Sequence, residues 1–200
     1  MTVTVGARIG NSFNLAVSGD AVAERFVDDN GNPHEANIEF IADRAITRGC
    51  NPPVVDRFCP GGSVTRAEMA AFLLNAIGRA PAASFAGTFS DVPAGLWYTP
   101  YVEALAALGF TSGLGDGTYG PNRAVSRAEM ATFLTRAFAL PAATTGSGFA
   151  DVPNGQWFSA AVDAVRQAGI TNGCTSTTYC PNDAVLREQM ATFLARALSR

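Results

Sequence analysis

The sequence predicts a mainly α-helical fold, made of three helix-loop-helix repeats packed around a pseudo-threefold axis, with short extended segments in the loops. A unit of about 60 residues recurs, since residues 89–138 and 149–198 align throughout and a more divergent copy runs from Phe26 to Ile77. Each copy also carries an apolar stripe at the spacing i, i+3, i+4, i+7, which marks the buried face of a helix. One such hairpin cannot bury its stripe alone, so three copies are expected to pack together. The stripes are Met69, Phe72, Leu73 and Ala76; Met130, Phe133, Leu134 and Ala137; and Met190, Phe193, Leu194 and Ala197.

The first helix of a copy is bounded by a polar residue and a glycine. In the second copy it is expected to start near Thr99 and Pro100, a cap residue followed by a proline at the first helical position, and to stop at Gly109. In the third copy Ser159 is the expected cap and Gly169 the stop.

The second helix of a copy opens with a stronger signal. Thr65 with Glu68, and Ser126 with Glu129, have the spacing of capping boxes. In a capping box the hydroxyl and the carboxylate each accept a backbone N–H of the helix start, so both helices are expected to begin directly after the hydroxyl residue.

An arginine stands at the first position of each of these helices, namely Arg66, Arg127 and Arg187. A cation there opposes the helix dipole, yet the third copy keeps its arginine although Leu186 and Gln189 replace the capping residues. One interpretation is that the arginine and free backbone N–H groups bind an external carboxylate. The alternative is an internal salt bridge to an aspartate of the same or a neighbouring copy. The aspartates considered are Asp28, Asp91 and Asp151.

Four cysteines occur as two local pairs. Cys50 and Cys59 flank the loop of the first copy, and Cys174 and Cys180 flank the equivalent loop of the third, whereas the second copy lacks both. Presence or absence in pairs predicts a disulfide within each loop. A metal site is the rival interpretation, but two thiolates with no nearby histidine would leave a zinc ion half ligated. Persistent disulfides predict a location outside the cytoplasm.

Composition excludes several classes of function. The chain is 48% hydrophobic with a net charge of −3, which argues against non-specific nucleic-acid binding, and no stretch is long and apolar enough for membrane insertion. His34 is the only histidine, and no nucleotide-binding or zinc-protease motif occurs. We therefore expect a protein that is not an enzyme and that needs no cofactor or metal.

The recurring motifs together resemble the S-layer homology (SLH) domain. They are F-x-D-V, then a tryptophan, a helix ending in G-[IF]-T-x-G, a short loop ending in proline, and [ST]-R-A-E-M opening a helix. The resemblance runs from Phe26 to Arg200 and is strongest in the second and third copies. In the first copy His34 stands where the other copies have Trp97 and Trp157, and Asp29 replaces the valine of F-x-D-V.

This resemblance implies a spindle-like bundle of three tandem SLH domains. The expected organisation is an unassigned N-terminal segment 1–25, a divergent repeat 26–80, and two further repeats at 86–140 and 146–200. It also implies a non-catalytic module in the cell wall or surface layer that anchors proteins by binding an acidic secondary cell-wall polysaccharide, which in this family often carries pyruvate ketals. The glycan-binding residues that it implies are Arg66, Arg127 and Arg187 for the charge, Trp97 and Trp157 as sugar platforms, and Asp28, Asp91 and Asp151 as acceptors of sugar hydroxyls or as groups that orient the arginines.

Self-association remains an alternative. Repeats that pack on one another within a chain are also suited to pack between chains, so a self-assembling subunit of a surface layer or filament, or a protein-docking module, is the competing hypothesis.

Overall fold

The computed structural model describes residues 25–200, so the N-terminal segment left unassigned above lies almost entirely outside the described residues. Within this range the fold is mainly helical, as predicted, and contains no β-strand beyond three isolated bridges. The helices are α1 (Glu35–Asp43), α2 (Arg66–Ala76), α3 (Thr99–Ala107), α4 (Arg127–Ala137), α5 (Ser159–Gln167) and α6 (Arg187–Leu198).

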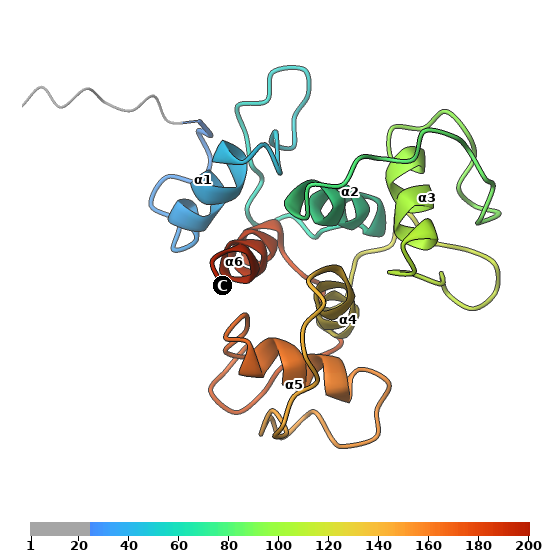
Figure 1. Ribbon diagram of the computed structural model, residues 1–200. Helices are drawn as coiled ribbons and strands as arrows, with labels where there is room; N and C mark the ends of the chain where they lie inside the picture. Colours follow the sequence, from blue (N-terminus) through green and yellow to red (C-terminus); the bar gives the residue numbers. More distant parts are fainter. Residues whose placement is uncertain (1–24) are drawn as a thin grey trace, which may run out of the picture.

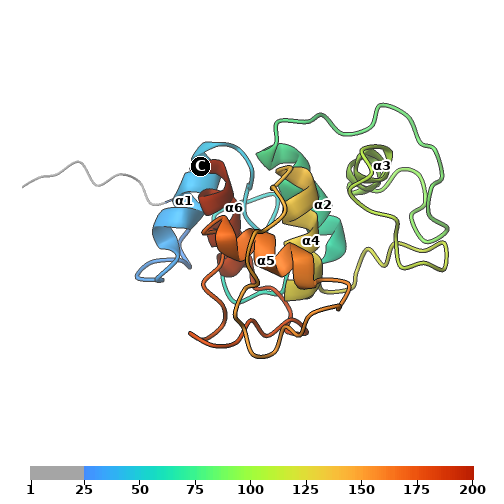
Figure 2. The ribbon, with the colours of Figure 1, turned by 60° about the horizontal axis from the view of Figure 1, so that its bottom comes forward.

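The six helices form an inner and an outer set. Helices α2, α4 and α6 surround the centre of the molecule, and α1, α3 and α5 lie outside them (Figure 1). Figure 2 shows α2 and α4 side by side in the middle, with α3 at the edge. The helix-loop-helix order of each repeat is therefore confirmed.

The packing partners of the outer helices were not predicted. Each outer helix packs mainly against the inner helix of a different repeat: α3 against α2, α5 against α4, and α1 against α6 (Figure 1). The last of these contacts joins the beginning of the described chain to its end and closes the ring. Asn32 and His34 support it with hydrogen bonds to Glu188 and Thr192 of α6, at 2.8 and 2.6 Å.

A ring of backbone hydrogen bonds lies where the three inner helices begin. The N–H of Val125 donates to Val64, that of Val185 donates to Val125, and that of Val64 donates to Val185, at N···O distances of 2.8–2.9 Å. All three valine side chains are fully buried. Each valine thus binds both other repeats. The extended segments that the sequence predicts lie earlier in the loops, around Thr118 and Tyr119 and around Thr178 and Tyr179, so this ring was not predicted.

The predicted apolar stripes form the core. Their methionines, phenylalanines and leucines are all buried, and most are inaccessible to solvent. The capping boxes at Thr65 and Ser126 are also present, with hydroxyl and carboxylate each accepting an N–H. In the third repeat only half of this arrangement remains, because Gln189 accepts from the N–H of Leu186 while leucine offers no acceptor in return.

The N-caps of the outer helices α3 and α5 lie one residue before the positions predicted, at Tyr98 and Phe158. Thr99 and Ser159 are the first helical residues, and their hydroxyls donate backwards to the carbonyls of Pro93 and Pro153, at 2.6 and 2.8 Å. These hydroxyls therefore fix the incoming loop instead of capping the helix.

Both predicted disulfides are present, Cys50–Cys59 and Cys174–Cys180, and the described residues include no free cysteine. In the second repeat Leu114 and Gly120 occupy the equivalent positions. A Cβ atom on Gly120 would lie 3.1 Å from Cδ1 of Leu114, so the leucine side chain covers the glycine where the other loops have sulfur. Gly120 has a φ of 70°, close to the φ of 58° at Cys59 and 57° at Cys180. The backbone of the second loop is therefore already shaped for a disulfide.

We predict that the double substitution Leu114→Cys, Gly120→Cys forms a third disulfide and stabilises the fold by about 2 kcal/mol, the chain-entropy value for so short a loop. Thiol titration should find no free thiol, and adding reductant should lower the thermal midpoint of the double variant. Gly120→Cys alone is the control. It should leave a free thiol and destabilise the fold, because the new side chain meets Leu114.

Asp29 is a buried carboxylate in an apolar position. It stands where the other repeats bury Val92 and Val152, its side chain is 2% exposed, and Oδ2 has no hydrogen-bond partner within residues 25–200. Burial, together with the nearby carboxylates of Glu39 and Glu35, raises the pKa of Asp29. A raised pKa means that the folded state favours the protonated form, so this group costs stability once the pH exceeds its unfolded pKa.

We predict that Asp29→Val raises the free energy of unfolding at pH 7 by about 1–3 kcal/mol, the usual cost of burying an unsatisfied polar group. The gain should shrink as the pH is lowered and should be lost below the unfolded pKa of about 3.8, towards pH 3, where the wild-type carboxyl becomes protonated in both states. Urea unfolding at both pH values measures this difference. A gain of equal size at both would show that the charge of Asp29 is irrelevant.

Candidate binding grooves

The arginine that opens each inner helix is inserted into the next repeat. Arg66 donates from Nε to the carbonyl of Tyr119 at 2.6 Å, and its guanidinium lies between the rings of Tyr119 and Phe133, 4.5 and 5.5 Å from their centroids. Tyr119 returns a hydrogen bond from its hydroxyl to the carbonyl of Arg66 at 2.8 Å. One side chain thus joins the first repeat to the core of the second.

The other two arginines repeat this geometry around the axis. Arg127 donates to the carbonyl of Tyr179 in the third repeat, and Arg187 donates to that of Phe58 in the first, both at 2.7 Å. All three guanidinium groups are nearly inaccessible to solvent, and burial lowers the pKa of each. Every repeat therefore gives one arginine and receives another.

The backbone N–H groups beside these arginines are not free, contrary to the sequence-based expectation. The N–H groups of Arg66 and Ala67 both donate to carbonyls of the next repeat, those of Arg123 and Pro121, at 2.9 Å. Equivalent bonds occur at the starts of α4 and α6. These helix ends are used for assembly of the ring and leave no open cradle for an anion.

Two of the arginines also form ion pairs between repeats. Nη1 of Arg66 contacts Oε1 of Glu129 at 2.9 Å, and Nη1 of Arg187 contacts Oε1 of Glu68 at 2.8 Å. The partner is thus the capping-box glutamate of the following repeat and not one of the three aspartates. Arg127 differs, because the residue at the corresponding place is Gln189, and Nη2 of Arg127 is buried without a partner in the described chain.

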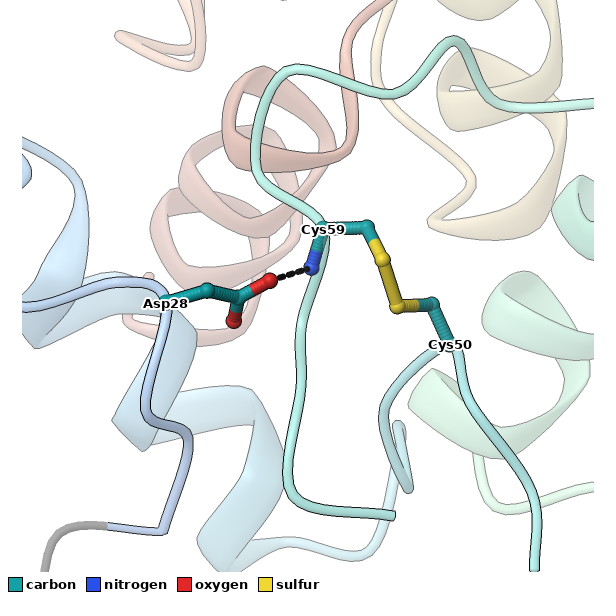
Figure 3. Close-up of side chains that lie close together, drawn as sticks. All are labelled: Asp28, Cys50 and Cys59. Carbon is teal, nitrogen blue, oxygen red and sulfur yellow. Dashed lines mark hydrogen bonds between the residues drawn. A yellow bond between two sulfur atoms is a disulfide. The ribbon is translucent and has the colours of Figure 1, made fainter. Parts of the chain in front are cut away.

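The three aspartates of the F-x-D motif hold loops. Both carboxylate oxygens of Asp91 accept backbone N–H groups, those of Tyr119 and Gly120, at 2.7 and 2.8 Å. Asp151 binds the N–H groups of Tyr179 and Cys180 in the same way. Asp28 does so with Phe58 and Cys59, and Figure 3 shows its contact with the Cys59 N–H. The aspartates therefore reach the arginines only indirectly, through the loops that carry the accepting carbonyls.

Within residues 25–200, one group of side chains has the spacing of a metal site: Asp28, Cys50 and Cys59, whose potential ligand atoms lie within 4.8 Å of one another. Figure 3 shows that the two sulfur atoms are bonded to each other. Sulfur in a disulfide is not a thiolate, so in the oxidised protein this group lacks the ligands that zinc requires.

Three grooves lie between the repeats, and each contains one inserted arginine. We name them the Arg66, Arg187 and Arg127 grooves; their volumes are about 450, 570 and 260 Å³. Each is built from all three repeats: one gives the arginine, the second gives an inner helix and the loop before it, and the third gives an aromatic side chain. The aromatic residue is Trp157, Trp97 and His34, respectively.

The two tryptophans that sequence reasoning selected are the most exposed aromatic groups on the described surface. Trp97 is 60% and Trp157 66% exposed, and each touches its neighbouring ring edge-on, so one face is left to the groove. Their packing against the core is slight. Both therefore suit a role in binding better than a role in stability.

Sequence reasoning missed a second arginine in the grooves. Arg136 and Arg196 lie in the last turn of α4 and α6 and donate to the carbonyls of Phe110 and Ile170, at 2.9 and 3.2 Å. In the first repeat Asn75 makes the equivalent bond to Ile46. The sequence does contain a pattern that could have indicated these residues, because a polar residue recurs at this position in all three inner helices.

Residues 88–131 and 148–191 match the S-layer homology domain. The match to this family model covers the second and third repeats, with Asp91, Asp151, Trp97, Trp157 and Arg127 inside it. Residues 26–77 lie outside both matched segments. None of the helices in residues 25–200 combines the length and the apolar character that crossing a membrane demands.

The chain is also similar to parts of relatives of different kinds. The chain is 34% identical over 110 residues to an amylopullulanase of Thermoanaerobacterium thermosulfurigenes, covering 55% of this chain and 6% of the relative. It is 35% identical over 109 residues to an endoglucanase of Bacillus sp. (strain KSM-635), covering 54% and 11%. It is 31% identical over 137 residues to the S-layer protein EA1 of Bacillus anthracis, covering 68% and 15%. The chain thus spans only a small part of each of these relatives.

We predict that the Glu129 carboxylate stabilises the fold at neutral pH and that this contribution is lost in acid. Burial opposes ionisation, but the N–H of Ser126 and the guanidinium groups of Arg123 and Arg66 prevail and lower the pKa of Glu129. Glu129→Gln should cost about 1–3 kcal/mol at pH 7. The difference from wild type should begin to shrink below the unfolded pKa of 4.5 and be lost as the pH falls through the lower pKa of the folded state. Urea denaturation across this range measures it.

Because the third repeat already has Gln189 at the equivalent place, the glutamine is sterically acceptable. A loss at pH 7 that persisted unchanged at pH 3 would show that packing, and not the ion pair, was removed.

Proposed function

We propose that this chain is a non-catalytic anchoring module of the bacterial cell surface, which binds an acidic secondary cell-wall polysaccharide in the grooves between its repeats. A pyruvate ketal is the acidic group that the family resemblance implies. We further propose that residues 26–80 are a divergent first repeat of the same kind, followed by repeats at 86–140 and 146–200.

The observation that carries this proposal is the diversity of the relatives. An amylopullulanase, an endoglucanase and an S-layer protein differ in what their names say they do, yet each matches more than half of this chain. That stretch is 15% or less of their length. We infer that the part they have in common with this chain serves attachment to a surface, which supports an extracellular location in the cell wall or surface layer.

The geometry of the grooves supports a saccharide as ligand. An exposed tryptophan at the rim of a groove offers a flat apolar face to a sugar ring, while the groove offers hydrogen-bond donors from arginines to hydroxyls and carboxylates. Both elements meet in the Arg66 and Arg187 grooves, with Trp157 and Trp97 as the platforms. The two disulfides suit a protein that works outside the cytoplasm.

We predict that Trp97→Ala and Trp157→Ala each weaken binding to purified cell-wall polysaccharide by about tenfold, equivalent to 1.4 kcal/mol. Both should leave the circular dichroism spectrum and the thermal midpoint unchanged, because these side chains are exposed. Leu108→Ala is the matched control, since Leu108 is also exposed but lies outside the grooves. Co-sedimentation with isolated walls, before and after extraction of the polysaccharide, is the measurement.

Self-association is the outcome that would replace this proposal. If the wild-type chain fails to sediment with any wall fraction but light scattering of the pure protein shows ordered assemblies, the grooves bind a second copy or another protein. Equal binding by the wild type and both tryptophan variants would exclude the platform role.

A further inference from the structure

The contact between the third and the first repeat is the one that closes the ring, and we call it the closing seam. The other two seams join repeats that follow one another in the chain, through the segments between α2 and α3 and between α4 and α5. A short tether holds packed partners at a high effective concentration. The closing seam has no such tether, so it is the place where the ring opens most readily.

The start of α6 lies on the disulfide loop of the first repeat, residues 49–62. The N–H groups of Arg187 and Glu188 donate across the closing seam to the carbonyls of Gly62 and Pro60, at 2.8 and 3.1 Å. Figure 3 shows the disulfide bridging the two arms of this loop. The shape of the loop therefore determines whether the first turn of α6 finds its acceptors.

The disulfide lies directly beside the carbonyls that receive the arginine side chain. Nε of Arg187 donates to the carbonyl of Phe58 at 2.7 Å, and Nη2 donates to that of Gly49 at 3.3 Å. The residues that follow these two in the chain are Cys59 and Cys50, which the disulfide joins. The disulfide thus holds both acceptors of the arginine in place relative to each other.

The closing seam lacks a hydrogen bond that the other two seams have. The hydroxyls of Tyr119 and Tyr179 donate to the carbonyls of Arg66 and Arg127, each at 2.8 Å. Phe58 stands at the equivalent place in the first repeat and has no hydroxyl. The first-repeat loop therefore accepts a hydrogen bond from the inserted arginine, but its aromatic residue gives none back.

The loop at the closing seam is also longer than its counterparts. Nine positions separate Cys50 from Cys59, against six between Cys174 and Cys180. The loop of the second repeat has the shorter length and keeps its shape with no disulfide. A longer loop loses more conformational entropy when its ends are fixed. A disulfide therefore contributes most at this seam, where the loop is longer and the tyrosine is missing.

We propose that the Cys50–Cys59 disulfide is a redox latch on the ring, and that its reduction opens the closing seam while the other two seams stay shut. A thiolate of a dithiol reductant attacks one sulfur to form a mixed disulfide, and the second thiol of the reductant then displaces that bond. Two electrons and two protons pass to the protein, both cysteines become thiols, and the reductant leaves as its own disulfide. Cys50 lines the Arg187 groove, which gives a small dithiol access to the bond.

Opening the closing seam separates the walls of the Arg187 groove. Arg187 comes from the third repeat, whereas Gly49, Cys50 and Pro52 come from the first. Reduction therefore dismantles this groove and leaves the Arg66 groove intact. The latch itself does not depend on the proposed function, because it concerns only the contacts between repeats.

The test is amide hydrogen exchange of the full chain, measured by NMR with the protein oxidised and after reduction with dithiothreitol. The amide groups of Arg187 and Glu188 should exchange about tenfold faster in the reduced protein, because they lose their acceptors across the seam. The variant Cys50→Leu, Cys59→Gly should show the same acceleration without reductant. It installs the residue pair that the second repeat has at these positions, so the substitutions suit this backbone.

The matched control is Cys174→Leu, Cys180→Gly, which removes the other disulfide. The amide groups of Arg127 and Ala128, which donate across the seam between the second and third repeats, should change by less than about twofold, because the tether and the Tyr179 hydroxyl remain. Equal acceleration at this seam and at the closing seam would overturn the inference. So would a uniform acceleration of all amide groups, which indicates loss of global stability.

Phe58→Tyr is the rescue variant and leaves every cysteine in place. Its hydroxyl is expected to reach the carbonyl of Arg187 as Tyr119 reaches that of Arg66, so reduction should accelerate exchange at Arg187 less than in the wild type. This comparison needs no cysteine substitution, so it keeps the test decisive if the disulfide variants fold poorly. Equal exchange at Arg187 in oxidised and reduced wild type would overturn the latch, and an unslowed reduced Phe58→Tyr would count against it.

Discussion

The first turn of each inner helix can be completed only by the next repeat. Its backbone N–H groups donate to carbonyls of that repeat, and its arginine donates to a further carbonyl there between two aromatic rings. A helix start without such partners would bury unsatisfied donors and an unpaired charge. No repeat is therefore complete in isolation, and because Arg187 of the last repeat needs the carbonyl of Phe58 in the first, the ring must close. The packing of α1 on α6 follows from the same requirement.

This requirement explains why the third repeat keeps Arg187 although its own cap has been lost. Leu186 affects only the start of α6, where a single N–H bond to Gln189 remains. Arg187 serves the first repeat instead, through Phe58, Glu68 and the carbonyl of Gly49. The cation opposes the dipole of its own helix, at a cost of about 0.3–1 kcal/mol, and gains a buried hydrogen bond and an ion pair elsewhere. The arginine is thus retained for contacts between repeats.

Local features were predictable from the sequence and contacts between repeats were not. The repeat period, the apolar stripes, the capping boxes and the paired cysteines each depend on residues close together in the chain, and the structure confirms all of them. The partner of Arg66 is Glu129, in a different repeat, and no local spacing indicates it. An internal salt bridge was foreseen as a possibility, but with the aspartates, which bind loop N–H groups instead. His34 was correctly aligned with the tryptophans, and the structure places it at the equivalent rim.

The motif S-R-A-E-M, read along the chain, looks like the signature of one site. In the folded protein its residues belong to two sites, because Arg127 reaches into the groove beside Gln189 while Glu129 lies in the groove of Arg66. The charge of a groove is therefore set by an arginine from one repeat and a residue from the following one. For this reason an intact motif in one repeat does not guarantee that the groove of its arginine is intact. The second repeat has the full motif, and its arginine is the one without a counter-charge, because the change lies in the third repeat.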